Sequence, residues 1–208
     1  MRMYCFYSIV NISSLSQNDY ERGYSIMNED RKRRVDRFRS VDDRKRSVCG
    51  ELLARRMIAG QCQIASEKVI IDVTDRGKPF ARDLPVEFSI SHSGEYVLCA
   101  VSDSPVGADI ERIRPVRVRL VRRVCTADEW KFVSEPGISE QEKTERFFRV
   151  WTAKEAYFKC LGTGITDLSK ACTVDQEFTD KLTYFIEKSY AVSIVGISEP
   201  VRMQDFCV

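Results

Sequence analysis

The middle of the chain reads Tyr96-Val97-Leu98-Cys99-Ala100-Val101 and, after four residues, Val106-Gly107-Ala108-Asp109-Ile110. Both runs are short and mainly apolar, with β-branched residues, which favours two strands. The first run ends a series that contains a strand at residues 3–10, a proline-free helical region at residues 27–60, and strands at residues 68–73 and 86–90 around a tight turn at residues 75–79. The second run begins the same order again.

The second half of the chain repeats this order in outline. Helical segments are expected at residues 117–133 and 139–161, followed by strands near Ala171, at residues 182–187 and at residues 190–195. The sequence therefore predicts an α+β protein with two similar helix-plus-antiparallel-sheet halves, residues 1–104 and 105–208. No low-complexity linker separates the halves, so we expect them to pack closely and to share any cleft.

Composition limits the classes of function. The 208 residues include 33 Lys and Arg against 31 Asp and Glu, which gives a formal net charge of +2. This balance argues against a protein that coats nucleic acid along its length, so any basic function must be local. No apolar run reaches the roughly 18 residues that a membrane-spanning helix needs, and the first residues resemble a strand rather than an export signal. We expect neither a nucleic-acid partner nor a membrane anchor.

The cysteines indicate a reducing environment. Eight cysteines are spread along the chain without a Cys-x-x-Cys pair, and there is one histidine. This spacing argues against structural zinc. Most of the cysteines lie in apolar runs, where a free thiol behaves as a small hydrophobic side chain. These features predict a cytoplasmic protein.

Asp109 and Glu111 are the first candidates for chemistry. As alternate residues of one strand, they point to the same face and repel one another. A divalent cation would relieve this repulsion, and one or two carboxylates together with substrate phosphates are a usual arrangement for Mg²⁺. The alternative is a solvated strand face, neutralised by Arg112 and Arg114.

A second group of candidates lies in the helical segment Trp151-Thr152-Ala153-Lys154-Glu155-Ala156-Tyr157-Phe158-Lys159. Glu155 and Lys159 are four residues apart and share a helix face, whereas Lys154 lies about 100° away. An ordinary ion pair would explain Glu155 and Lys159. The functional alternative is a third metal carboxylate flanked by two ammonium groups that bind phosphates.

The only histidine, His92, lies among hydroxyls in Ser89-Ile90-Ser91-His92-Ser93. A structural hydrogen bond is the simpler interpretation, although His92 and Ser91 together could bind a phosphate oxygen. A Gly-x-Ser-x-Gly elbow is absent, which disfavours a serine hydrolase. Basic residues are also frequent between residues 31 and 56, where most should form a solvated helix face. Arg31, Arg34 and Arg46 would suit a small, multiply phosphorylated molecule better than a duplex.

Five motifs occur in an order that resembles one known family. They are Arg-Phe-x4-Asp-x2-Arg at residues 37–46, Gly77-Lys78-Pro79, Ser-Ile-Ser-His-Ser at 89–93, Gly-Ala-Asp-Ile-Glu at 107–111, and Trp-x-x-Lys-Glu-Ala-x-x-Lys at 151–159. The set resembles the 4′-phosphopantetheinyl transferases. Length and layout are similar to the surfactin-synthetase-activating (Sfp-like) type, a monomer whose two halves are related by a pseudo-twofold axis.

The resemblance implies a reaction and two domains. The phosphopantetheine arm of coenzyme A would be moved to a serine of an apo acyl or peptidyl carrier protein, with release of adenosine 3′,5′-bisphosphate. Residues 1–104 would bind the nucleotide, and residues 105–208 would carry the magnesium site and catalytic helix. The carrier protein would contact the region after Gly164, which includes Asp167, Leu168 and Lys170.

The resemblance also implies roles for individual residues. The magnesium ligands would be Asp109, Glu111 and Glu155, with Mn²⁺ as an alternative ion, and Asp109 would also contribute to the coenzyme A site. Lys154 and Lys159 would lie near the pyrophosphate. The nucleotide and its 3′-phosphate would be held by Arg46, Lys78, Pro79, Ser91 and His92, and by Arg31 and Arg34, which stand where the family carries lysines.

The serine proton needs an acceptor. Glu129 matches a glutamate that has this role in some members of the family, and Glu155 or a metal-bound water is the competing candidate. Thr126-Ala127-Asp128-Glu129 is also a capping box, which gives Glu129 a purely structural interpretation.

Two other functions compete with a transferase. A non-catalytic module that binds RNA or another polyanion would show a steep salt dependence and no need for metal. A coenzyme A sensor would bind the ligand without turnover. The presence of Asp109, Glu111, Lys154 and Glu155 together disfavours the sensor, since binding alone does not require a complete metal set.

Overall fold

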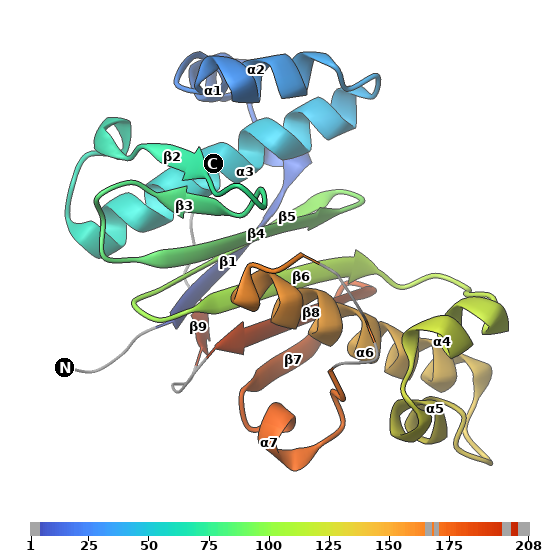
Figure 1. Cartoon of the computed structure of the whole chain (residues 1–208). Helices are drawn as coiled ribbons and strands as arrows, with labels where there is room; N and C mark the ends of the chain where they lie inside the picture. The colour runs from blue at the N-terminus through green and yellow to red at the C-terminus, as the bar shows by residue number, and fades with distance from the viewer. Residues whose placement is uncertain (1–4, 165–167, 169–170, 197–200, 204–208) are drawn as a thin grey trace.

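A computed structural model describes residues 5–164, 168, 171–196 and 201–203 (Figure 1). The expected first residues of the N-terminal strand, Met3 and Tyr4, and two of the expected carrier-contact residues, Asp167 and Lys170, lie outside these ranges. Within the described residues, no helix has both the length and the hydrophobicity that a membrane span requires.

The first half contains one long helix and an antiparallel sheet. Its elements are β1 (Cys5–Asn11), a 3₁₀ turn (Ile12–Ser14), α1 (Gln17–Ser25), α2 (Glu29–Asp36), α3 (Val41–Cys62), a 3₁₀ turn (Ser66–Lys68), β2 (Ile71–Val73), β3 (Pro79–Ala81), β4 (Glu87–Ser93) and β5 (Tyr96–Ser102). Strands β4, β5 and β1 pair antiparallel in that order, and β9 (Val201–Met203) adds a parallel edge to β1. Strands β2 and β3 form a separate hairpin.

The second half repeats this plan. Its elements are β6 (Val106–Arg112), α4 (Val118–Val124), α5 (Ala127–Val133), α6 (Glu140–Leu161), α7 (Gln176–Thr179), β7 (Leu182–Glu187) and β8 (Tyr190–Gly196). The antiparallel order β7-β8-β6 matches β4-β5-β1, and in each half a helix of 22 residues, α3 or α6, connects the first strand to the later pair. The expected α+β fold with two similar halves is confirmed.

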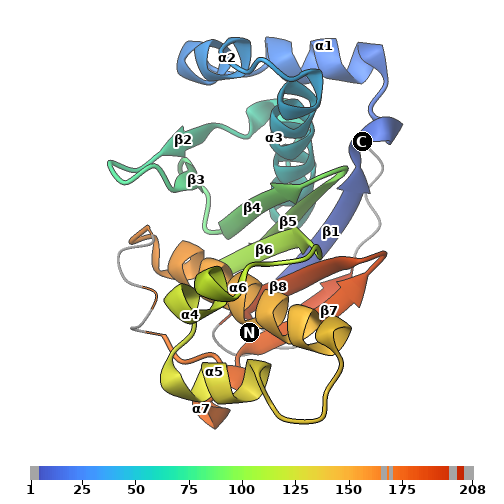
Figure 2. The ribbon, with the colours of Figure 1, turned by 90° about the vertical axis from the view of Figure 1, so that its right-hand side faces the viewer.

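The two halves share a core. One cluster of buried side chains is drawn from β1, β5, β6 and β8, and it includes Leu98, Ala100, Ile110 and Val192. Strand β4, at the edge of the first sheet, contacts β6, at the edge of the second (Figure 2). The two halves therefore pack closely, as the absence of a linker predicted. A cleft can form at the boundary between them.

Helix α6 lies unusually close to β6. A methyl group on Gly107 would be 1.8 Å from the carbonyl oxygen of Ala156 and 2.5 Å from the nitrogen of Cys160, so only glycine permits this approach. The helix ends at Gly162, whose φ of 66° is the left-handed conformation that glycine adopts easily. The contact brings the end of α6 against the acidic strand.

Several expectations about local structure were wrong. No strand forms at Ala171, because its carbonyl oxygen accepts a hydrogen bond from the Lys154 ammonium instead of a ladder partner. Of the strand predicted at residues 68–73, only Ile71–Val73 form a strand, β2, because Ser66–Lys68 form a 3₁₀ turn. Helix α1 and strand β9 were not predicted, because α1 is a short, mainly polar helix and β9 has only three residues.

Candidate active site

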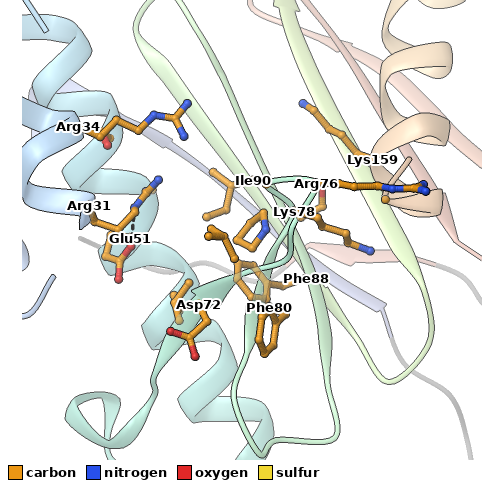
Figure 3. A pocket seen from close by; sticks show the side chains of 18 of the residues that line it. Arg31, Arg34, Glu51, Asp72, Arg76, Lys78, Phe80, Phe88, Ile90 and Lys159 are labelled. Atoms are coloured by element: carbon orange, nitrogen blue, oxygen red, sulfur yellow. Dashed lines mark ion pairs between the residues drawn. The ribbon is translucent and has the colours of Figure 1, made fainter. Parts of the chain in front are cut away.

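A cavity of about 850 Å³ opens between the halves. Helices α2 and α3, the β2–β3 hairpin and strand β4 line it from the first half, and the end of α6 lines it from the second. The cations in its wall are Arg31, Arg34, Arg46, Arg76, Lys78 and Lys159. Figure 3 shows Arg31 and Arg34 on one side, Arg76, Lys78 and Lys159 on the other, and Phe80, Phe88 and Ile90 between them.

Three serines of β4 bridge the two halves. The hydroxyl of Ser89 accepts a hydrogen bond from the backbone N–H of Ala108 at 3.0 Å, and the hydroxyl of Ser93 accepts one from the N–H of Arg112 at 3.1 Å. Ser91 and Ser93 also donate to the carboxylates of Asp109, at 2.7 Å, and Glu111, at 2.8 Å. The serine motif and the acidic motif of the sequence therefore face one another across the boundary.

Asp109 lies at the centre of this arrangement. Its Oδ1 accepts hydrogen bonds from the Ser91 hydroxyl and from the Lys159 ammonium, each at 2.7 Å. The same ammonium contacts the Ser91 hydroxyl at 2.9 Å and the Ala108 carbonyl at 3.2 Å. The other carboxylate oxygen, Oδ2, is buried and has no hydrogen-bond partner among the residues that the structure describes. A buried oxygen in this state is a ligand atom that a cation could satisfy.

Glu111 and Glu155 have higher pKa values than ordinary glutamates, so each is protonated more easily. The pKa of Glu155 is raised to about 7, mainly by burial and also by the charge of Asp109, although Lys159 acts to lower it. Burial also raises the pKa of Glu111. The hydrogen bond from Ser93 acts to lower this pKa, whereas the charge of Asp109 adds to the rise. The three carboxylates thus repel one another in a partly dry site.

The three carboxylates are suitable ligands for a hard cation, although their side chains do not converge on one point. Asp109, Glu111 and Glu155 supply only oxygen, which Mg²⁺ and Mn²⁺ prefer, and their mutual repulsion and the free Oδ2 would both be relieved by a positive charge. Among the described residues, however, no three His, Cys, Asp or Glu side chains converge as a ready-made metal site. Coordination by all three would require a rearrangement of side chains.

His92 and Arg46 lie in the cavity wall beside this centre. Burial lowers the pKa of His92, and the nearby charges of Arg46 and Lys159 lower it further. Arg46 pairs with Asp43 and donates to the carbonyl oxygen of Gly94. The imidazole is therefore mainly neutral at pH 7, beside cations that an anionic ligand would neutralise.

Lys78 and Pro79 reach the cavity from the turn between β2 and β3. Gly77 has a φ of 82°, and the turn is closed by the bond from its N–H to the Thr74 carbonyl at 2.8 Å. The Lys78 ammonium contacts Glu87 Oε2 and the carbonyl of Cys160, each at 3.2 Å. Lys78 thereby joins the hairpin to the end of α6.

The structure does not bring Glu129 or Lys154 to the cavity. Both side chains have 0% exposure, and Lys154 Nζ lies 2.8 Å from Glu129 Oε2. Lys154 also donates to the carbonyls of Leu168 and Ala171, and Glu129 accepts from Thr173 and from the backbone N–H of Thr126. Lys154 does not line the cavity in this arrangement, because its position on α6 turns it away from Glu155 and toward Glu129 of α5. The capping box of Glu129 is present.

Comparison with known proteins assigns the chain to a family. Residues 14–104 match the sequence profile described as 4′-phosphopantetheinyl transferase, N-terminal, and residues 105–199 match that of the 4′-phosphopantetheinyl transferase superfamily. The 4′-phosphopantetheinyl transferase Sfp of Bacillus subtilis strain 168 is 32% identical over 161 residues, which cover 77% of this chain and 71% of Sfp. The chain belongs to the 4′-phosphopantetheinyl transferase superfamily.

Two further 4′-phosphopantetheinyl transferases show the same similarity. The psf-1 protein of Bacillus pumilus is 37% identical over 134 residues, and the gsp protein of Aneurinibacillus migulanus is 34% identical over 158 residues. These alignments cover 64% and 76% of this chain but only 56% and 65% of the two relatives. The chain thus spans less than two thirds of either relative. The resemblance to the Sfp-like type is confirmed at the level of the family.

Several residues at the site of this family member were missed by sequence analysis. Glu51 and Arg76 line the cavity, and Ser93 holds Glu111. Arg76 lies beside Lys78 in the predicted turn, so its place next to the Gly-Lys-Pro motif was an available signal. Glu51 had no such signal, because a glutamate four residues before an arginine on a helix usually indicates an ordinary surface ion pair.

Proposed function

We propose that this protein transfers the 4′-phosphopantetheine group of coenzyme A to a serine of an apo acyl or peptidyl carrier protein, and releases adenosine 3′,5′-bisphosphate. One observation carries the proposal: the cavity has a basic region at each side of an apolar wall. Coenzyme A has the same distribution, with a 3′-phosphate, an apolar base and a pyrophosphate. Family membership supports the reaction type.

The residues of the first half would hold the nucleotide. Arg31 and Arg34 on α2 would bind the 3′-phosphate, since guanidinium groups form paired hydrogen bonds to phosphate oxygens. Arg46 and His92 lie in the same wall and would contribute to this end of the site. Pro79 and Phe88 would contact the base. Both halves of one chain complete the cavity, so we expect a monomer to suffice.

The residues of the second half would hold the pyrophosphate. Lys159 lines the cavity and contacts Asp109, so it can bind a phosphate oxygen from the side at which the acidic residues lie. Lys78 faces the same end of α6. Asp109, Glu111 and Glu155 would hold Mg²⁺, which would neutralise charge on the pyrophosphate linkage and on the departing adenosine 3′,5′-bisphosphate. Ser91 and Ser93 keep two of these carboxylates oriented.

Glu155 is favoured over Glu129 as the acceptor of the serine proton. Glu155 lines the cavity, whereas Glu129 is completely buried and its oxygens already accept hydrogen bonds. Bound Mg²⁺ would lower the pKa of Glu155 below its metal-free value of about 7, so the carboxylate would be ionised at neutral pH and able to take the proton. In-line attack by the serine oxygen on the β-phosphorus breaks the bond to the bridging oxygen of adenosine 3′,5′-bisphosphate.

A labelled coenzyme A tests the proposed transfer. The protein is incubated with apo carrier protein, Mg²⁺ and coenzyme A that bears a fluorophore on its thiol. Fluorescence that stays with the carrier after denaturation supports transfer, and it must vanish when the acceptor serine of the carrier is replaced by alanine. Binding of labelled coenzyme A without any labelled carrier would favour the sensor. Salt-sensitive binding of RNA with no affinity for coenzyme A would favour the polyanion module.

A further inference from the structure

Glu51 is a buried acid in the wall of a cavity that is otherwise built for anions. Its side chain is 2% exposed, and within the described part of the chain one of its oxygens, Oε2, has no hydrogen-bond partner. Nε of Arg31 lies 3.5 Å from Oε2, and this nitrogen is also buried without a hydrogen bond to any described residue (Figure 3). An acid beside an anion site weakens the site's positive potential, so its presence calls for a compensating role.

Arg55 fixes the position of Glu51. One helical turn further along α3, its Nε donates to Glu51 Oε1 at 2.9 Å. The remaining nitrogens of Arg55 donate to the carbonyls of Val69 and Ile26, so its guanidinium is held on three sides. Arg55 is 6% exposed and does not line the cavity, so it acts as a support behind Glu51.

The same support reaches the helix that carries Arg31. Ile26 directly precedes the connection to α2, and Asn28 caps α2 by accepting a hydrogen bond from the N–H of Arg31 at 2.9 Å. Arg55 therefore ties down the start of α2 through Ile26 and the side chain of Arg31 through Glu51. The two tethers define both the backbone and the side-chain position of Arg31.

We propose that Glu51 is a positioning residue that holds Arg31 by its Nε edge and so directs the terminal guanidinium nitrogens to the 3′-phosphate of the nucleotide. The proposal rests on the proposed function, because it takes coenzyme A as the ligand. A guanidinium has two edges for hydrogen bonding, and a carboxylate on one edge leaves the other for a phosphate. Glu51 would thus set the preference for a 3′-phosphorylated nucleotide.

Two explanations of Glu51 differ in the sign of the effect of Glu51→Gln. If Glu51 acted only through its charge, its neutralisation would strengthen the binding of every anion. If it positions Arg31, the variant binds adenosine 3′,5′-bisphosphate more weakly and leaves the binding of adenosine 5′-monophosphate nearly unchanged. The measured quantity is the ratio of the two dissociation constants, obtained by calorimetry in metal-free buffer.

The full-length chain and four variants give the test. We expect Glu51→Gln to reduce the preference for the bisphosphate by about tenfold, because it removes the ion pair that holds the Arg31 guanidinium. Arg31→Ala should reduce it at least as much, and the double variant should resemble Arg31→Ala alone. Asp30→Asn is the matched control, since Asp30 lines the same wall but pairs with Arg33. Its preference should stay within twofold of the original, as about 0.4 kcal/mol of surface electrostatics implies.

The outcomes separate the two claims. An unchanged or increased preference in Glu51→Gln, or additive losses in the double variant, would overturn the positioning role. Equal weakening of both nucleotides would show a structural effect and would overturn it too. If Glu51→Gln does not fold, Glu51→Asp replaces it: the shorter side chain keeps the charge but withdraws the carboxylate from Arg31 Nε, and it must still lower the preference. No preference in the unmodified protein would instead refute the proposed nucleotide site.

Discussion

The ammonium of Lys159 lies 2.7 Å from Oδ1 of Asp109, and this ion pair joins helix α6 to strand β6 at the edge of the cavity. Ser91 of β4 contacts both partners, so one cation, one acid and one hydroxyl from three elements meet at one point. Lys159 is 32% exposed and Asp109 is 5% exposed at the side chain, which leaves the ammonium accessible to a ligand while the acid is covered.

Asp109→Asn should reduce transfer by at least about a hundredfold, because it removes the negative charge of a proposed metal ligand while preserving shape. The amide can still accept the hydrogen bond from Ser91. The measurement is the initial rate of carrier modification at saturating Mg²⁺, with circular dichroism as a control of folding. Retention of more than half of the original rate would remove Asp109 from the metal site.

Gly107→Ala should destabilise the protein, because its methyl group would overlap the carbonyl oxygen of Ala156 at 1.8 Å. Relief of the clash requires α6 to move away from β6, and we expect a loss of about 3 kcal/mol in the free energy of unfolding in urea. Gly196→Ala is the matched control, since Gly196 pairs with Val106 on the neighbouring strand and the added carbon meets none of the described residues within 4 Å. Equal stability of the two variants would contradict the close approach of α6.

The lone histidine allows a direct titration. The proton resonances of His92 should give a midpoint below 6.5, because burial and the charges of Arg46 and Lys159 lower its pKa. A depressed folded-state pKa means that the unfolded chain takes up the proton first. The neutral imidazole therefore stabilises the folded protein above the unfolded-state pKa of His92. This stabilisation is lost as the pH falls toward the folded-state pKa.

Two controls accompany this titration. His92→Gln must lack the resonance, which confirms the assignment. Addition of adenosine 3′,5′-bisphosphate should raise the midpoint, since a nearby phosphate favours the imidazolium. A midpoint at or above 6.5 in the free protein would show that the charges of Arg46 and Lys159 and the desolvation by the cavity wall do not act on His92.

Glu129 and Lys154 should behave as a buried structural pair. Replacement of one partner, as in Lys154→Met, leaves an uncompensated buried charge and should cost about 3–5 kcal/mol in the free energy of unfolding. The double variant Glu129→Gln/Lys154→Met should recover part of this loss. If the folded double variant transfers phosphopantetheine at a rate near the original, neither residue is catalytic. A stable but inactive double variant would restore the chemical role that the sequence suggested.

Much of the architecture could be predicted from the sequence, since periodicity and order carry it. The strands at β1, β4, β5, β6, β7 and β8 and the long helices α3 and α6 were expected from runs of apolar residues. The order of the motifs indicated the family correctly. Short elements such as β9 were missed because three residues carry no periodicity.

The site was harder to predict, because it depends on which way each side chain faces. Lys154 and Glu155 are adjacent in sequence, yet one is buried against Glu129 and the other lines the cavity. The bridge from Ser91 to Asp109 connects two halves of the chain, and no local pattern signals it. Glu51 resembles a surface residue in the sequence and is buried only because Arg55 and Arg31 flank it.

The most direct test of the proposed reaction is the intact mass of an apo carrier protein after incubation with this protein, coenzyme A and Mg²⁺. We expect the carrier protein to gain about 340 Da, the mass of one phosphopantetheine group attached covalently, and to gain nothing in EDTA. The absence of any gain across acyl and peptidyl carriers, with coenzyme A bound to the protein in the same samples, would contradict it.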